Sequence, residues 1–444
     1  MYRPFTLILF MAVAMATGCL VVETPYSKLP PGQWRAVLKI QPEFITPNPD
    51  AKPLPDKVDM EYDDVKSGEL PFNFEVIYDN DTTFHIVIQN GTERIEVPAS
   101  DIAFGRTKER ARDTIRIDFP VYESYITGVF AGNVIEGSWV VTTRENYAIP
   151  FVAHHGKSFR FTPLMKTPTA DLSGKWKATF GLEENDPYPA AGEFLQKGNH
   201  LSGTFMTETG DYRYLEGTVQ GDKAFLSTFD GSHAFLFEAK ILTDSLLTGA
   251  FYSGKHYRTT WEAERNAQFE LNSPDSLTYL LPGYDDKLTF SFKNPEGQVI
   301  SPDNPEYEGK FKIIQIMGTW CPNCRDETNF LVNYLRENQP DDVAVIALAF
   351  EKHRDAQSAN KAIRTYREKF NMPYEVVFAG YPDKDAARTL PMLNGIISYP
   401  TMIFMDKHNR VRRIHTGFSG PATSQYESFT KDFLQFMEAM HHED

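Results

Sequence analysis

Cysteine is scarce in this chain, which has three among 444 residues: Cys19, Cys321 and Cys324. A structural zinc site usually needs four nitrogen or sulfur ligands, and the histidines of this chain show no zinc-finger spacing. Zinc at Cys321 and Cys324 is therefore disfavoured, and we expect no metal site. A purely structural disulfide between them is also disfavoured, because a bridge that closes so short a loop adds little stability. The pair is thus a candidate for redox chemistry.

Basic residues are also in short supply. Lys and Arg number 45 against 60 Asp and Glu, which gives a net charge of −15. Nucleic acids and anionic membrane surfaces attract basic patches, so we expect neither as a partner. With 41% hydrophobic residues, the chain is long enough for several cores, and its length suggests about three domains.

The N-terminus lacks a hydrophobic run of membrane-spanning length. Arg3 precedes an apolar stretch, residues 5–16, which is shorter than the ~20 residues that a transmembrane helix needs. The following Ala16-Thr17-Gly18-Cys19 resembles a bacterial lipobox, although Leu is commoner than Ala at its first position. We expect residues 1–19 to be a lipoprotein signal peptide with Cys19 as the lipidated residue. The alternative is an ordinary cleaved signal with an incidental cysteine. Either reading implies export to a compartment where disulfides form.

The most informative stretch is Trp320-Cys321-Pro322-Asn323-Cys324. It follows an apolar run at 313–317 and precedes a segment with apolar residues at helical spacing, which predicts a strand, a tight turn and a helix. Cys321 then lies at the helix N-terminus and Pro322 at its first position, where proline is tolerated. Unpaired N–H groups and the helix dipole lower the pKa of a thiol placed there. Cys324, one turn deeper, can resolve a mixed disulfide on Cys321.

A second landmark is Tyr399-Pro400-Thr401, which precedes an apolar run at 402–405 and a hairpin return at 411–417. Together with W-C-P-x-C, this x-P-T motif resembles the TlpA/ResA-type branch of thioredoxin-fold proteins, over residues 285–444. The resemblance implies that Pro400 is cis and lies against the cysteines, and that Tyr399 offers backbone groups to an extended substrate. Trp320, Pro322 and Thr401 complete the substrate-docking edge that it implies.

Glu327 follows Cys324 by three residues, and the same family resemblance implies a role for it. There, a carboxylate near the buried cysteine tunes its deprotonation and shuttles a proton, so Glu327 joins Cys321 and Cys324 as a candidate catalytic residue. The alternative is that a glutamate in the first turns of a helix is favoured by the dipole alone. We expect Arg325 to be a solvated surface charge.

The region before this domain has short alternating apolar runs separated by Gly, Asn and Asp, which predicts all-β structure. It also looks duplicated, since the G-x-W motif around Trp34 recurs around Trp176. We expect β-rich repeat modules at 28–160 and 170–268, built as antiparallel barrels or sandwiches, and a linker at 271–284. Barrels of about eight strands can enclose a small ligand, but no catalytic motif emerges here.

Within residues 285–444 we expect a buried central strand at 343–350. The helices expected there are at 355–371, at 383–393 and, closing the domain, at 424–441. The predicted fold class is therefore multidomain: two tandem all-β modules followed by an α/β thioredoxin-like domain.

The predicted function is that of an envelope thiol–disulfide oxidoreductase, with the reductase direction following from the resemblance. No cofactor beyond the Cys321–Cys324 disulfide is expected. Its partners would be client protein disulfides or thiols and a membrane dithiol electron donor. The protein would be lipid-anchored through Cys19 in the cell envelope of a Gram-negative-type bacterium, facing the periplasm.

The sequence leaves two other functions to consider. In the first, the protein is a binding or scaffold lipoprotein: the β-modules bind a ligand or partner and the thioredoxin-like domain recognises clients, although such a domain has no need of both cysteines. In the second it is a peroxidase, which is disfavoured because the sequence before Cys321 lacks the P-x-x-x-T-x-x-C arrangement of peroxiredoxins.

Overall fold

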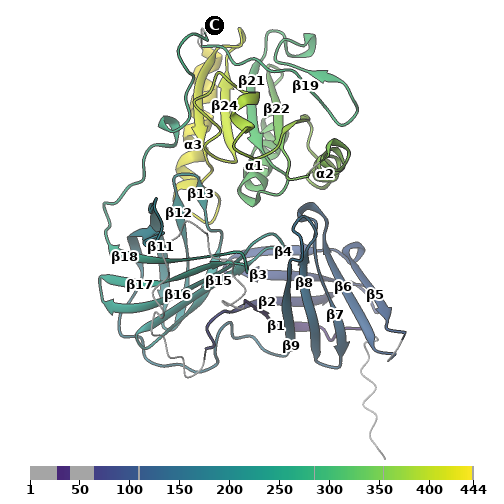
Figure 1. Ribbon diagram of the computed structural model, residues 1–444, viewed down its shortest axis with the longest axis vertical. Coiled ribbons are helices and arrows are strands. Elements are labelled where there is room, and N and C mark those ends of the chain that lie inside the picture. The colour runs from purple at the N-terminus through teal and green to yellow at the C-terminus, as the bar shows by residue number, and fades with distance from the viewer. Residues whose placement is uncertain (1–27, 41–64, 109–110, 285, 354, 443–444) are drawn as a thin grey trace, which may run out of the picture.

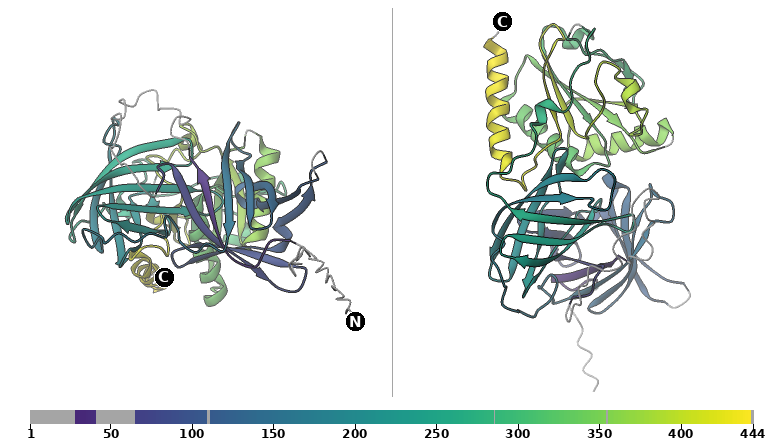
Figure 2. Two further views of the ribbon diagram at one scale, coloured as in Figure 1. Left: turned by 90° about the horizontal axis from the view of Figure 1, so that it is seen from below. Right: turned by 60° about the vertical axis from the view of Figure 1, so that its left-hand side comes forward.

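The computed structural model describes residues 28–40, 65–108, 111–284, 286–353 and 355–442. Its strands form three sheets, two of them in a β-rich N-terminal part and one in an α/β C-terminal domain. The C-terminal domain stands above the two β-rich units (Figure 1), and the right-hand view of Figure 2 shows the same arrangement. None of the helices in the described ranges combines the length and apolarity needed to cross a membrane. The signal peptide and Cys19 lie outside the described residues.

The first sheet is open and antiparallel. Its nine strands run in the order β4-β3-β2-β1-β9-β8-β7-β6-β5, so that β4 and β5 are its edges. Along β3 every second residue is buried, as alternation in the sequence predicts for a strand with one face on a core. The strands are β1 (Gly32–Lys39), β2 (Glu69–Tyr78), β3 (Phe84–Asn90), β4 (Glu93–Val97), β5 (Ile102–Arg106), β6 (Asp113–Phe119), β7 (Ser124–Ala131), β8 (Val134–Val141) and β9 (Ala148–His155).

The second sheet closes into a barrel. Its order is β11-β10-β18-β17-β16-β15-β14-β12-β13, and the additional pairing of β11 with β12 joins eight strands into a ring. Aromatic side chains such as Phe205, Phe237 and Trp261 fill the interior, as in other small barrels. The strands are β10 (Gly174–Phe180), β11 (Tyr188–Lys197), β12 (His200–Thr207), β13 (Gly210–Asp211), β14 (Leu215–Gln220), β15 (Lys223–Phe229), β16 (Ala234–Thr243), β17 (Leu246–Ser253) and β18 (Tyr257–Arg265).

The two tryptophans of the G-x-W motifs occupy equivalent places. Trp34 lies in β1 and Trp176 in β10, the first strand of each sheet, and both side chains are fully buried. Each indole N–H donates to the carbonyl oxygen four residues earlier, at 3.0 Å for Trp34 and 2.9 Å for Trp176. The duplication itself stays a prediction.

The open sheet and the barrel share a hydrophobic core. The outer face of the barrel contributes Phe225, Phe229, Leu236 and Tyr252 to the core of the first sheet. The ring of Phe229 stacks on that of Phe72, with centroids 4.4 Å apart. The barrel therefore covers the face that the open sheet leaves uncovered.

The C-terminal sheet has the order β20-β19-β23-β22-β21-β24-β25. Strands β21, β22 and β23 are parallel, and β24 pairs antiparallel with β21. All seven residues of β21 are buried, as expected for a central strand. The strands are β19 (Phe292–Lys293), β20 (Val299–Ile300), β21 (Phe311–Met317), β22 (Val343–Phe350), β23 (Glu375–Gly380), β24 (Thr401–Met405) and β25 (Val411–Thr416).

Three α-helices cover one face of this sheet: α1 (Pro322–Asn338), α2 (Ala356–Lys369) and α3 (Gln425–His442). The opposite face packs against the segments around Leu288 and Leu390. The prediction of a helix at 383–393 is wrong, because only the 3-10 turn η6 (Ala386–Thr389) forms there. Pro391 disfavours helical geometry at the residue before it. The other 3-10 turns are η2 (Ala99–Asp101), η3 (Pro120–Tyr122), η4 (Pro274–Ser276) and η5 (Pro305–Tyr307).

Candidate active site

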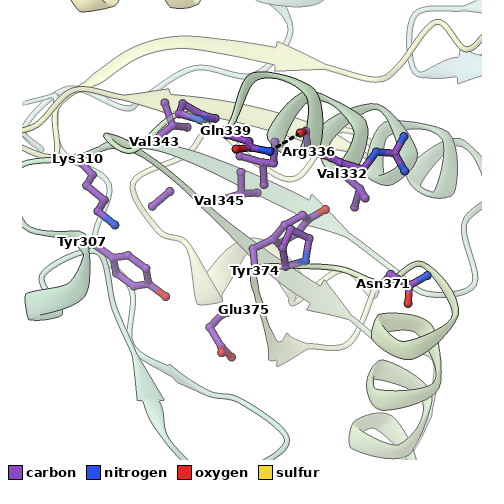
Figure 3. A pocket seen from close by; sticks show the side chains of 14 residues that line it. Tyr307, Lys310, Val332, Arg336, Gln339, Val343, Val345, Asn371, Tyr374 and Glu375 are labelled. Carbon is purple, nitrogen blue, oxygen red and sulfur yellow. Dashed lines mark hydrogen bonds between the residues drawn. The ribbon is translucent and has the colours of Figure 1, made fainter.

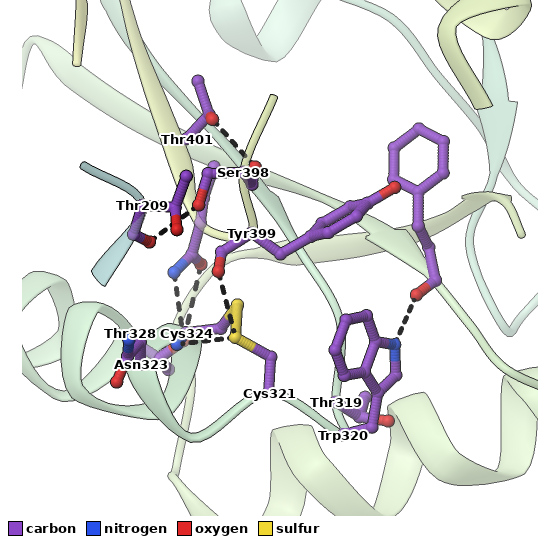
Figure 4. The surroundings of a disulfide bond; sticks show 12 residues. Thr209, Thr319, Trp320, Cys321, Asn323, Cys324, Thr328, Ser398, Tyr399 and Thr401 are labelled. Atoms are coloured by element: carbon purple, nitrogen blue, oxygen red, sulfur yellow. Dashed lines mark hydrogen bonds between the residues drawn. A yellow bond between two sulfur atoms is a disulfide. The ribbon is translucent and has the colours of Figure 1, made fainter. Parts of the chain in front are cut away.

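Cys321 and Cys324 form a disulfide at the N-terminus of α1, with their Cα atoms 5.2 Å apart. Cys321 is the N-cap residue and Pro322 is the first residue of the helix. The backbone N–H of Cys324 donates to Sγ of Cys321 over 3.1 Å (Figure 4). In the reduced protein the same donor would stabilise a thiolate at Cys321. Cys324 is fully buried, whereas Cys321 is 6% exposed, so Cys321 is the sulfur that a client can reach.

The proline loop lies directly against this disulfide. The peptide bond between Tyr399 and Pro400 is cis. The carbonyl oxygen of Tyr399 lies 3.3 Å from Sγ of Cys321 (Figure 4). Thr401, the first residue of β24, donates its hydroxyl to the carbonyl oxygen of Ser398 over 2.9 Å. Two motifs separated by almost 80 residues in the sequence thus meet at one sulfur atom.

Trp320 forms a wall beside the disulfide. Its indole N–H donates to the carbonyl oxygen of Phe350 over 2.9 Å, and its ring meets that of Tyr399 edge-on at 5.5 Å. The ammonium of Lys352 lies 3.7 Å from the centre of the Trp320 ring, a cation–π contact. These contacts fix the indole ring next to Cys321.

Glu327 lies on α1 three residues after Cys324 and is fully buried. Residues at this spacing share one helix face. Burial raises the pKa of Glu327 to about 8, and the nearby Gln315 offsets this rise in part. Neither carboxyl oxygen has a hydrogen-bond partner within the described part of the chain. A carboxyl group with such a pKa can exchange a proton with a thiol near neutral pH.

The comparisons with known proteins concern this domain. Residues 285–414 match the model of the AhpC/TSA family. The thioredoxin-like protein YneN of Bacillus subtilis is 25% identical over 128 residues, which are 29% of this chain and 68% of that protein. The thiol-disulfide oxidoreductase ResA of Halalkalibacterium halodurans is 21% identical over 150 residues, 34% of this chain and 74% of that protein. The C-terminal domain is thioredoxin-like. The family match and these relatives support thiol–disulfide oxidoreductase activity at a general level.

Solved structures similar to the thioredoxin-like domain include a putative thioredoxin from Neisseria meningitidis. It is 19% identical, with a TM-score of 0.27, and the match covers 36% of this chain and 93% of that one. The C-terminal domain of a putative thiol-disulfide oxidoreductase from Bacteroides thetaiotaomicron is 12% identical with a TM-score of 0.28. That match covers 38% of this chain and 99% of the other.

A buried ion cluster joins the thioredoxin-like domain to both β-rich units, and sequence reasoning missed it. Arg213 of the barrel is 1% exposed and pairs with Glu93 of the open sheet at 2.7 Å and with Asp326 of α1. Arg325 also reaches Glu93, at 3.2 Å, so the expectation that it is a solvated charge is wrong. Burial alone would raise the pKa of Asp230, but His233, Arg213 and Arg325 hold it below its usual range. We call Glu93, Arg213, Asp230, Arg325 and Asp326 the interdomain ion cluster.

The barrel also reaches the proline loop. The turn between β12 and β13 places the carbonyl oxygen of Thr209 2.8 Å from the hydroxyl of Ser398, which donates to it (Figure 4). Asn323, inside the CPNC motif, donates to the carbonyl oxygen of Asp211 over 3.3 Å. A pocket of about 360 Å³ remains between Cys321 and the barrel. The barrel therefore forms one side of the route to the disulfide.

A separate hollow of about 680 Å³ lies at the other end of α1 (Figure 3). It is lined by residues such as Tyr307, Gln339 and Tyr374. A helix of this length spans about 25 Å, so this hollow is remote from the disulfide. Within the described ranges, no group of three or more His, Cys, Asp or Glu residues could hold a metal ion.

Proposed function

We propose that this protein reduces protein disulfides by dithiol exchange through Cys321 and Cys324. The observation that carries the proposal is the sulfur of Cys321 at a helix N-terminus, hydrogen-bonded by the N–H of Cys324 and in contact with the cis-proline loop. A reactive cysteine needs stabilisation of its thiolate, partial access and a resolving partner. The helix N-terminus, the 6% exposure of Cys321 and the adjacent Cys324 support these three requirements. ResA, one of the relatives, is itself named a thiol-disulfide oxidoreductase.

The proposed reaction begins with the reduced pair. The Cys321 thiolate attacks one sulfur of a client disulfide, and the other client sulfur leaves as a thiolate that takes up a proton. Cys324 then loses its proton and attacks Sγ of Cys321, which releases the second client thiol and forms the Cys321–Cys324 disulfide. Two electrons pass to the client. A membrane dithiol donor restores the pair by the same exchange in the opposite direction.

Glu327 is proposed to accept the proton of Cys324 in the resolving step. Cys324 is fully buried, so solvent does not reach its thiol directly. Burial raises the pKa of Glu327 from the usual 4.5 to about 8, which brings it much closer to the pKa range of thiols. A smaller gap between donor and acceptor favours proton transfer between them.

The proposed location is the periplasmic side of the envelope of a Gram-negative-type bacterium, with a lipid on Cys19. The lipobox-like sequence before Cys19 supports the anchor. Growth of an expressing strain with a radiolabelled fatty acid tests it. We expect label on the wild-type protein and none on Cys19→Ala, and equal labelling of both would contradict the assignment.

The reduction potential of the Cys321–Cys324 pair tests the reductase direction. The measurement uses the chain without residues 1–19, equilibrated against defined thiol–disulfide buffers, with Cys324→Ser as the control that cannot close the ring. A potential of roughly −270 mV or lower, near that of thioredoxin, is expected. A value near about −120 mV, typical of a strong oxidant, would overturn the reductase assignment.

A further inference from the structure

A small pocket with a basic lining shares Trp320 with the pocket that contains Cys321. Its volume is about 160 Å³, and its lining includes Arg144, His233, His256 and Lys352. Burial and the charge of Arg144 lower the pKa of His256 to about 3, so this imidazole is neutral and the positive charge comes from the other side chains. No Asp or Glu lines it. The chain as a whole carries a net charge of −15. We call it the basic pocket.

The basic pocket adjoins the pocket that contains Cys321. Trp320 and His233 line both this pocket and the 360 Å³ pocket that contains Cys321. Trp320 directly precedes Cys321 in the chain, and the Lys352 ammonium lies 3.7 Å from the indole ring centre. When a client cysteine is bound at Cys321, the client side chain next to that cysteine can therefore reach the basic pocket.

The carboxylates nearest to this pocket are already engaged. Asp230 accepts hydrogen bonds from the backbone N–H groups of Ser232 and His233, and it belongs to the interdomain ion cluster. Glu351 accepts two hydrogen bonds from Thr319. Asp230 also lies 3.6 Å from Nδ1 of His233, so it is the counter-ion of that side chain, whereas neither carboxylate pairs with Arg144 or Lys352.

The outermost cations of the pocket lack a counter-ion. Glu123, which lies close by, is paired with His353 at 2.5 Å. Among the described residues, Arg144 and Lys352 have no carboxylate within ion-pair distance, and each lies against an aromatic ring instead. Burial and the charge of Arg144 lower the pKa of Lys352 to about 8, with Glu351 compensating in part. An anion bound between the two would relieve this repulsion.

We propose that the basic pocket binds the carboxylate side chain of an acidic residue next to the cysteine that a client exchanges. The volume is well below the roughly 300 Å³ of sites for drug-sized ligands, so a single side chain fits it better than a whole small molecule. The inference rests on the proposed disulfide reduction and adds a substrate class to it. Clients would carry Asp or Glu beside their cysteine.

The test compares two disulfide-linked peptide dimers that differ only in having Glu or Gln on either side of the cysteine. The full chain without residues 1–19 is pre-reduced and mixed with excess dimer, and the rate of Cys321–Cys324 oxidation is followed by acid quenching and thiol alkylation. For the wild type we expect the Glu dimer to react about tenfold faster, from two charge contacts of roughly threefold each. The preference should shrink as salt is added.

The variant Arg144→Gln/Lys352→Gln should lower the Glu-to-Gln rate ratio from about ten to about one. The control Lys361→Gln/Lys431→Gln removes the same charge from exposed positions on α2 and α3, and it should retain the wild-type ratio. A wild-type ratio near one, or a ratio unchanged by Arg144→Gln/Lys352→Gln, would overturn the inference while leaving disulfide reduction intact.

A binding measurement separates the inference from the proposed function. Cys321→Ser/Cys324→Ser cannot exchange disulfides, so the anisotropy of fluorescent peptides with serine in place of cysteine reports binding alone. Tighter binding of the Glu peptide, by about tenfold, supports the basic pocket even if no dimer is reduced. Equal affinity for the Glu and Gln peptides contradicts it.

Discussion

Replacement of Glu327 by glutamine should stabilise the protein, and the gain should increase with pH. The folded protein holds the carboxyl proton with a pKa of about 8, whereas the ordinary value is 4.5. Between these two values the native state keeps a proton that the unfolded chain has lost. The free energy of unfolding therefore falls as the pH rises through this window. Glutamine carries no titrating proton, so Glu327→Gln removes that loss.

The size of the effect follows from the two pKa values. Their difference is 8 minus 4.5, or 3.5, and one unit corresponds to about 1.4 kcal/mol. The stability difference between Glu327→Gln and the wild type should be close to zero at about pH 4. It should reach about 3 kcal/mol at pH 7 and approach about 5 kcal/mol above pH 9. Side chains of similar size and shape leave the packing of α1 nearly unchanged.

Urea unfolding of both proteins in the disulfide form, at several pH values from about 4 to 9, measures this difference. The control is Glu427→Gln, which removes a carboxyl from the exposed side of α3. A gain that does not change with pH, or one below about 1 kcal/mol at pH 7, would refute the assignment of a buried, protonated Glu327. The same variant should resolve mixed disulfides more slowly at about pH 8 and above, where Glu327 is ionised in the wild type and can accept the Cys324 proton.

Three further predictions concern the rest of the molecule. Arg213→Met should lower the free energy of unfolding, measured by thermal unfolding, by about 3–5 kcal/mol, because it leaves buried carboxylates unpaired. Adding Asp326→Asn should recover part of that loss. Strictly additive effects of the two substitutions would argue against the ion pair. Cys324→Ser should accumulate a mixed disulfide between Cys321 and a client peptide, visible as a band on a non-reducing gel that dithiothreitol removes. Phe229→Ala should lower the free energy of unfolding by about 3–5 kcal/mol, and it should lower the unfolding midpoints of the open sheet and the barrel together. A shift confined to the barrel would contradict the shared core.

The local part of the active site was accessible from the sequence because its signals lie close together in the chain. Cys321, Pro322 and the apolar periodicity after them predict a helix that starts at a cysteine, and α1 begins there. Tyr399-Pro400-Thr401 before an apolar run predicts a loop entering a strand, which is β24. That these two segments meet at Sγ of Cys321 came from the family resemblance, since neither motif alone encodes the contact.

The interdomain contacts were out of reach for a physical reason. Arg213 and Asp326 are 113 residues apart, and an ion pair at that separation leaves no periodic pattern. The helical position of Arg325 suggested a solvent-facing side chain only because the β-rich units that cover it could not be placed. The prediction of barrels or sandwiches likewise could not distinguish the open sheet from the closed barrel, since both have the same alternating strands. Closure depends on whether two edges meet, as β11 and β12 do.

The core shared by the open sheet and the barrel limits how this protein can be divided. A barrel of eight strands normally turns polar residues outward and can be moved between proteins as an independent part. Here its outer wall carries Phe225, Phe229 and Leu236. An excised barrel would expose these side chains to water as an aggregation-prone apolar patch. The two β-rich units can therefore be inherited, deleted or transplanted only as a pair, and a recombinant fragment that ends between them should aggregate rather than fold.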